Sequence, residues 1–314
     1  MLRTLFSSPV EKTISLYLGM NKIALCKYEE GKPKLVAGEY IQSDREWATV
    51  LNKVLLANEL KNHRVSVVIS KDFYQTFDID KPLVEEKELL GALPFTIKDL
   101  VSSSVFDLVV DYVDRPAQTR KNTQIMVVCI EQSRVVQIRD LLSQNGLTLN
   151  SMTIEEIATC QLFDCLNKKH HDKNKQKALK NNDANILIAQ HEGELLLSVV
   201  KNGQLYFSSH LRGFRERLAM PLQDEENTLI EDLSLEIQRV LDFINSQLKV
   251  SAINTLYLAI NCADLDLLSA KLSEYIAQNV KPFSTLCDDS FVDSNAHNYD
   301  FLLAYGGLSK GLVK

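Results

Sequence analysis

The sequence predicts an α/β fold of two lobes, because one strand pattern occurs twice along the chain. The run "ISLYLGMNKIALCKYEEGKPKLVAGEYI" (14–41) has the rhythm of three strands joined by tight turns, and "NILIAQHEGELLLSVVKNGQLYFSSHLRG" (185–213) repeats it. Helical and strand-like segments alternate after each copy, which is typical of α/β folds with mixed sheets. The copies agree in architecture and not in residue identity. We therefore expect a duplicated fold with one sheet in each lobe.

Composition narrows the class of protein. The 314 residues are 45% hydrophobic and 24% charged, which is ordinary for a globular protein of this size. The net charge of −6 argues against nucleic acid as the main partner. No run approaches the roughly 18 apolar residues of a transmembrane helix, so no membrane span is expected. The six cysteines form no CxxC pair, which favours reduced thiols in a cytosolic protein.

The first lobe is predicted to comprise residues 1–79 and 151–182. Apolar residues in 45–60 recur at helical spacing, and two short strand-like runs follow before residue 80. A helix is expected over 155–166.

Residues 80–150 are predicted to form a small subdomain inserted in this lobe. Its run "PLVEEKELLGALPFTIKDLV" is helical in the first half, with a break expected at Pro94, because proline lacks an amide donor. Two strand-like runs follow it. The next helix is expected to be capped by Ser133 and to end before Gly146.

The stretch "NKKHHDKNKQKALKNND" (167–183) has no periodicity and carries six lysines against two aspartates. It is interpreted as a solvated connection between the lobes. Two weaker alternatives are contact with acidic lipid headgroups and metal binding by His170 and His171. Metal binding is disfavoured because no third ligand is evident and adjacent loop histidines seldom converge on one ion.

Residues 183–314 are predicted to form the second lobe. The strongest helical pattern of the chain lies at 228–248, where Thr228 and Glu231 have the spacing of a capping box. Four further segments are expected after it, namely a strand, a helix, a short strand and a final helix near the C-terminus.

Four segments in order carry a family resemblance: "LGALPFTIKDLVSSSVFDLVVDYVD", "RVVQIRDLLSQNGLTLNSMTIEEIA", "LSLEIQRVLDFINSQLKVSAINTLYLA" and "DFLLAYGGL". Together they cover nearly the whole chain. The pattern resembles the actin-like ATPase superfamily, within it the PilM-like proteins of type IV pilus assembly, and among these most of all the MshI group of mannose-sensitive haemagglutinin (MSHA) pilus biogenesis. The resemblance implies an actin-like, ribonuclease H-like duplicated fold with two lobes and an inserted small subdomain.

The family binds nucleotide at turns that this chain has changed. Where PilM-like proteins carry a pattern like Asp-Ile-Gly-Ser, residues 17–21 read Tyr-Leu-Gly-Met-Asn, so Tyr17 stands in the place of the carboxylate. In the second turn Ala189 stands where a carboxylate is expected, and Glu192 comes later. Only Gly19, Asn21, Glu192 and Gly193 remain as phosphate-side positions.

Two further elements depart from the family pattern. The adenine-side turn, residues 259–263, contains no glycine. The gap from Arg212 to Thr228 is too short to hold comfortably the helix that carries ribose contacts in the family. A magnesium–nucleotide site needs carboxylates and a close backbone approach to phosphate. We therefore expect no catalytic residue, no metal and no cofactor.

The resemblance thus implies a scaffold that lies in the cytoplasm, peripheral to the inner membrane through its partners. Its expected partner is the cytoplasmic tail of a PilN-like bitopic inner-membrane protein, bound within the insert (80–150), together with other pilus assembly proteins. The alternative is a nucleotide-binding or ATP-hydrolysing switch of the same fold, with ATP and magnesium held at Gly19, Asn21, Glu192 and Gly193. A sugar kinase is weaker still, because no catalytic aspartate follows the second glycine turn.

Overall fold

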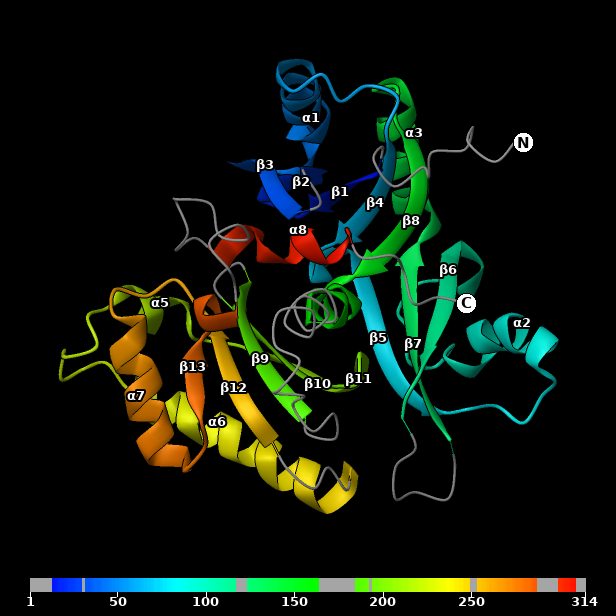
Figure 1. Ribbon diagram of the computed structural model, residues 1–314. Coiled ribbons are helices and arrows are strands. Elements are labelled where there is room, and N and C mark those ends of the chain that lie inside the picture. Colours follow the sequence, from blue (N-terminus) through cyan, green and yellow to red (C-terminus); the bar gives the residue numbers. More distant parts are fainter. Residues whose placement is uncertain are drawn as a thin grey trace, which may run out of the picture.

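The computed structural model describes residues 13–29, 32–116, 123–163, 184–191, 194–248, 253–286 and 299–308. The strands of this part of the chain form two five-stranded sheets and one three-stranded sheet. Each five-stranded sheet is the centre of one lobe, and the three-stranded sheet belongs to an insert that lies beside both lobes (Figure 1). The two-lobed α/β fold with an inserted subdomain is thereby confirmed.

The sheet of the first lobe has the order β3-β2-β1-β4-β8. Its strands are β1 (Thr13–Leu18), β2 (Lys22–Glu29), β3 (Lys32–Tyr40), β4 (Arg64–Ile69) and β8 (Thr148–Ile154). The first three form an antiparallel meander, and β4 and β8 add to it in parallel.

The second lobe repeats this order and sense as β11-β10-β9-β12-β13. Its strands are β9 (Ala184–His191), β10 (Glu194–Lys201), β11 (Gln204–Leu211), β12 (Ile253–Ala259) and β13 (Val280–Pro282). Strands β9 to β11 form the meander, and β12 and β13 are parallel to β9. The repeated strand rhythm in the sequence therefore reflects two sheets of equal topology.

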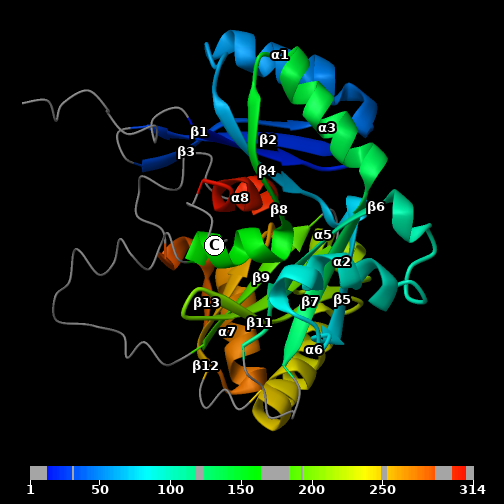
Figure 2. The same cartoon turned by 90° about the vertical axis from the view of Figure 1, so that its right-hand side faces the viewer.

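Helices cover both sheets. In the first lobe they are α1 (Trp47–Ala57) and α3 (Gln132–Gln144), and in the second α5 (Arg215–Ala219), α6 (Leu229–Phe243) and α7 (Leu265–Ile276). The helix of residues 155–163 and the short α8 (Leu302–Gly306) lie between the two sheets in both views (Figures 1 and 2). Among the described helices none is long and apolar enough to cross a membrane.

The C-terminal helix belongs to the core of the first lobe, although 183–314 was expected to form the second lobe alone. Leu302, Leu303 and Ala304 of α8 are buried with residues of β1 and β4. Gly306 packs against the helix of residues 155–163, where an added Cβ would lie 2.2 Å from the Ala158 carbonyl oxygen. The Gly-Gly pair thus permits close packing as well as ending the helix.

The insert contains β5 (Tyr74–Asp80), β6 (Leu108–Asp114), β7 (Gln124–Glu131) and α2 (Glu86–Thr96). Its antiparallel sheet has the order β5-β7-β6, and α2 covers one face. The sheet starts at Tyr74 rather than at residue 80, because Tyr74 already pairs with Ile130. At the other end, α3 buries its apolar side chains in the core of the first lobe.

Three local expectations differ from the structure. The helix α2 runs through Pro94 to Thr96, since only the last turn loses an amide donor and the Thr96 hydroxyl bonds the Ala92 carbonyl. Ser133 lies inside α3, which begins after Glu131 without a side-chain cap. Thr228 likewise makes no capping hydrogen bond, and its hydroxyl donates to Asp232 instead.

Candidate functional site

The first turn of the meander, where Gly19 and Asn21 lie, is closed by bonds within the chain. The Gly19 amide donates to the Lys22 carbonyl at 2.9 Å, and the Gly19 carbonyl accepts from the Trp47 indole at 2.9 Å. The Asn21 carbonyl accepts from the Ile41 amide at 2.8 Å. Gly19 is buried, whereas Met20 is exposed. The Gly19 amide and the Gly19 and Asn21 carbonyls are therefore hydrogen-bonded to other residues of the first lobe.

The second turn is only partly described, since Glu192 and Gly193 lie outside the described residues. Its flanking residues, His191 and Glu194, are paired across β9 and β10. Counting back from each turn, Tyr17 and Ala189 hold equivalent positions in the two sheets. The turn after β12 is tied by side chains, because the Gln190 amide oxygen accepts from the Asn261 amide and the Asn261 side chain accepts from the Tyr299 amide, both at 2.8 Å.

A buried polar cluster joins the two lobes at the end of β1. The Tyr17 hydroxyl donates to Glu155 Oε1 at 2.7 Å, and His191 Nδ1 of the second lobe lies 3.0 Å from the same oxygen. Tyr17 and Glu155 are almost completely buried, and His191 is 4% exposed. The ammonium group of the buried Lys22 lies 5.4 Å from the centre of the Tyr17 ring. The position of the expected carboxylate is thus filled by a phenol whose partner is a carboxylate from another element.

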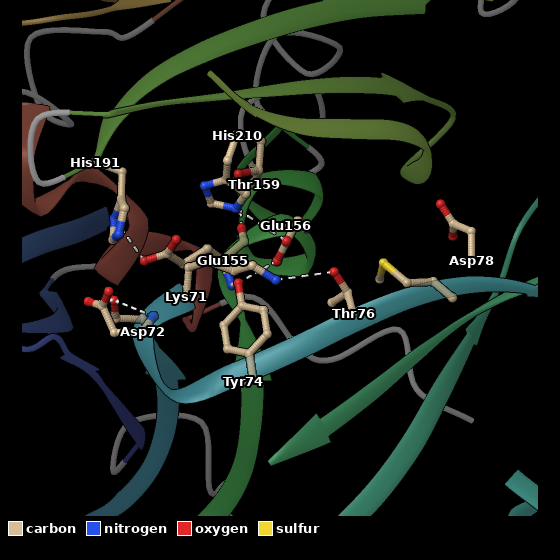
Figure 3. Close-up of polar contacts among 12 residues, drawn as sticks. Lys71, Asp72, Tyr74, Thr76, Asp78, Glu155, Glu156, Thr159, His191 and His210 are labelled. Atoms are coloured by element: carbon tan, nitrogen blue, oxygen red, sulfur yellow. Dashed lines mark hydrogen bonds and ion pairs between the residues drawn. The ribbon is translucent and has the colours of Figure 1, made fainter. Parts of the chain in front are cut away.

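A second set of contacts lies beside the first and involves the insert. The Tyr74 hydroxyl donates to Glu156 Oε2 at 2.5 Å, and His210 Nε2 on β11 lies 3.5 Å from Glu156 Oε1. The ammonium of Lys71 lies 4.7 Å from the centre of the Tyr74 ring and donates to Thr76 at 3.2 Å. Figure 3 shows both histidines pointing from the second lobe toward the two glutamates. Adjacent glutamates therefore tie three parts of the molecule together.

The local fold explains how two neighbouring carboxylates can be buried. Glu155 and Glu156 are the first two residues of the helix that follows β8, and the positive end of a helix dipole stabilises negative charge. Burial raises the pKa of Glu156, but the contact with His210, the hydrogen bond from Tyr74 and the charge of Lys71 outweigh it and leave that pKa lowered. Burial, reinforced by the charges of Glu156 and Glu155, raises the pKa of the Tyr74 phenol well above its usual value.

Within the described residues, Glu155 Oε2 and both ring nitrogens of His210 have no hydrogen-bond partner, so the 3.5 Å approach of His210 to Glu156 is an ion-pair contact only. Buried polar atoms of this kind are commonly satisfied by ordered water. No group of three or more His, Cys, Asp or Glu side chains in the described part of the chain has the arrangement of a metal site. The cluster is therefore suited to hold the two lobes together through hydrogen bonds and ion pairs.

Sequence reasoning identified Tyr17 but missed its partners. Glu155 and Glu156 were predicted only as the start of a helix, and His191, His210 and Tyr74 received no role. The one available signal was the pair of glutamates directly after a buried strand. The histidines carry no such signal, because their contacts with the glutamates join residues far apart in the chain.

Two of the cavities that border this region bear on function. One of about 590 Å³ lies between β5 and the second lobe and is lined by Lys71, Thr76, His191 and Arg212, among others. The other, of about 250 Å³, lies where the insert meets the first lobe, and we call it the junction cavity. Its lining includes the following residues of the insert and first lobe: Asp72, Phe73, Tyr74, Gln75, Val101, Ser103, Leu108, Cys129, Ile130, Glu131 and Arg134.

The junction cavity has a fixed cation at its wall. Arg134, on the first turn of α3, lies 2.5 Å from Asp44 and 4.3 Å from the centre of the Phe73 ring. Beside the cavity, β6 pairs with β7 along one side only, so its other edge is unpaired within the described residues. A cavity with apolar and charged residues in its lining, beside an open strand edge, can receive an extended peptide. Such a peptide adds main-chain hydrogen bonds while its side chains enter the pocket.

Comparisons with known proteins identify the fold. No protein-family model and no curated protein matches the chain. Among solved structures, a PilM–PilN type IV pilus biogenesis complex is similar with a TM-score of 0.68 at 16% identity, covering 95% of this chain and 97% of that chain. A Bacteroides thetaiotaomicron protein with an actin-like ATPase fold and unknown function has a TM-score of 0.51 at 14% identity, covering 96% and 97%. This chain therefore has the actin-like ATPase fold over nearly its whole length.

Proposed function

We propose that this protein is a scaffold of type IV pilus assembly that binds the cytoplasmic tail of a PilN-like bitopic inner-membrane protein. The observation that carries the proposal is the similarity to a structure of a PilM–PilN complex over 95% of the chain. The resemblance of the sequence to the MshI group makes the MSHA-type pilus our proposed system. In this function the protein is cytoplasmic and peripheral to the inner membrane through its partners, which include other pilus assembly proteins.

We further propose that the region between the two lobes that holds the Tyr17–Glu155–His191 contacts, called the cleft below, neither binds nor hydrolyses ATP. In the part of the cleft that the structure describes, the residues do not fit a magnesium–nucleotide. The Tyr17 phenol fills the carboxylate position and donates to Glu155, and the Gly19 amide is bonded to the Lys22 carbonyl. The lobes are instead held by the Tyr17–Glu155–His191 contacts, so no ligand is needed to join them.

The tail is proposed to bind at the junction cavity and along the open edge of β6. The apolar part of the cavity, Leu108 and Ile130 among its lining, suits an aliphatic side chain of an extended segment. Acidic residues of the surrounding insert favour a tail that carries Lys or Arg, so binding should weaken as salt is raised.

A cavity-filling substitution tests this placement. Ser103 lines the junction cavity, whereas its neighbour Ser102 is exposed and does not. With an N-terminal peptide of a candidate PilN-like protein, Ser103→Trp is expected to weaken binding at least about tenfold, while Ser102→Trp leaves it unchanged, since a lost pocket contact is worth more than about 1 kcal/mol. Amide exchange is expected to show protection over 101–114 and the neighbouring strands. Protection confined to residues beyond 183 would contradict the proposed site.

The alternative nucleotide switch has one supporting observation, the 590 Å³ cavity with Lys71, His191 and Arg212 in its wall. A thermal-shift series with magnesium–ATP separates it from the scaffold. A ligand at 100 times its dissociation constant stabilises a protein by about 2.7 kcal/mol, which is easily seen. We expect no shift at millimolar nucleotide and the same tail affinity with and without ATP. A clear shift, or magnesium-dependent hydrolysis, would replace the scaffold proposal by the switch.

A further inference from the structure

The outer side of the insert exposes large apolar side chains to an unusual degree. Seven of the thirteen exposed large hydrophobic residues in the described part of the chain lie between residues 83 and 109. Six of them are on α2 or on the turns that flank it, and we call these six the outer patch: Leu83, Val84, Leu90, Phe95, Leu100 and Phe106. In both views α2 lies on the side of the insert that faces away from the two lobes (Figures 1 and 2).

An aromatic pair is the centre of the outer patch. The ring centres of Phe95 and Phe106 are 6.5 Å apart in an edge-to-face arrangement, and the side chains are 60% and 79% exposed. Ser104 accepts a hydrogen bond from the Phe106 amide, which fixes the turn that presents this ring. A pair of adjacent aromatic side chains that is exposed to solvent is typical of the energetic centre of a protein interface.

The charge around the patch indicates what it binds. Residues 81–114 contain seven acidic and three basic residues, a net charge of −4 out of −6 for the chain. An anionic bilayer is disfavoured because this surplus is repelled by acidic headgroups. A second copy that used the same patch is also disfavoured, because a two-fold contact would set acidic rim against acidic rim.

We propose that the outer patch binds a basic amphipathic helix of a partner protein, separately from the tail at the junction cavity. Apolar residues of the partner cover Phe95 and Phe106, and its Lys or Arg residues meet the acidic rim. A helix is proposed because a helix with one apolar stripe flanked by basic residues can cover the Phe95–Phe106 pair and reach the surrounding acidic side chains at the same time. The proposal does not depend on the identity of the tail or on the state of the cleft.

Three peptides of about 18 residues, five helical turns, test the proposal by calorimetry on the full chain. All carry the same Leu/Phe stripe, with Lys, Gln or Glu on the polar face. The Lys peptide is expected to bind most tightly and the Glu peptide most weakly, with binding that weakens as salt is raised. Peptide-dependent amide protection is expected over α2, residues 86–96, outside the 101–114 range expected for the tail.

Matched variants complete the test. Phe95→Ser together with Phe106→Ser is expected to weaken the Lys peptide at least about tenfold. The control, Leu56→Ser together with Tyr275→Ser, removes residues of similar exposure on α1 and α7 and is expected to change nothing. The proposal is overturned if the Lys peptide does not bind, if Lys and Glu peptides bind equally, or if the Phe variants bind normally. Vesicle binding or self-association that the Phe substitutions abolish would assign the patch to a membrane or to a second copy and would overturn it as well.

Discussion

The cleft buries polar side chains, whereas the outer side of the insert exposes apolar ones. In the cleft, carboxylates, phenols and imidazoles are buried and contact one another, as Tyr17, Glu155 and His191 do. On the insert, Phe95 and Phe106 are exposed and their rings lie edge to face. Buried polar groups that have found partners stabilise the fold, whereas exposed aromatic groups gain free energy only when something covers them. This difference is the basis of our proposals that the insert binds partners and that the cleft has a structural role.

Removing the Glu155 carboxylate should have the largest effect on stability of the changes that test this comparison. Glu155→Ala leaves the Tyr17 hydroxyl and His191 buried without their acceptor, and we expect it to lower the free energy of unfolding by about 3 to 5 kcal/mol. Urea denaturation measures this loss, and Glu155→Gln, which keeps an acceptor oxygen, is expected to cost less. A loss below about 1 kcal/mol for the alanine variant would show that the cluster does not hold the lobes.

Changing the phenol tests what occupies the carboxylate position. Tyr17→Phe removes one hydrogen bond to Glu155 and should cost about 1 to 2 kcal/mol in the free energy of unfolding. Tyr17→Asp should be destabilising too, because it sets a second carboxylate against Glu155, and it should not create magnesium-dependent ATP hydrolysis. An ATPase assay of the folded Asp variant checks this. Hydrolysis by that variant would mean that Tyr17 alone prevents ATP hydrolysis in the protein.

The pH dependence of stability should report the second set of cleft contacts, with a smaller effect. The lowered pKa of Glu156 contributes stability that is present above its usual pKa, about 4.3, and is lost as the pH falls through the folded value. The raised pKa of Tyr74 contributes stability that is present below about pH 10 and is lost above it. Denaturation midpoints measured against pH should therefore fall at both ends. Glu156→Gln should flatten the acid limb, and an unchanged limb would contradict this assignment.

The outer patch should show the smallest effect on stability. Phe106→Ser removes a side chain that is 79% exposed, so the free energy of unfolding should change by no more than about 0.5 kcal/mol. Leu89→Ser, on the buried side of α2, is the matched contrast and should cost several times more. The same denaturation series measures both. A loss above about 1 kcal/mol for Phe106→Ser would place this ring in the core of the insert and would remove the comparison.

The sequence by itself determined the two meanders, the insert and the major helices of both lobes. Strand alternation and helical spacing are local signals, since they follow from which side of an element faces the core. Gly146 also took its expected place after α3, with a φ of +68° that favours glycine. The places of Pro94 and Ser133 were less predictable, because the cost of a missing amide or cap depends on the helix turn in which the residue falls.

Only the tertiary structure decided the site. Tyr17 and Glu155 are 138 residues apart, and nothing in either local segment indicates that they are hydrogen-bonded. The return of α8 to the first lobe likewise depends on the close approach of Gly306 to the Ala158 carbonyl. Local sequence patterns predict which helices and strands form, because they depend on the backbone preference of each residue and on whether its side chain is apolar. Contacts between distant elements depend on how whole sheets pack against one another. Which buried polar groups contact each other therefore cannot be predicted from local sequence patterns.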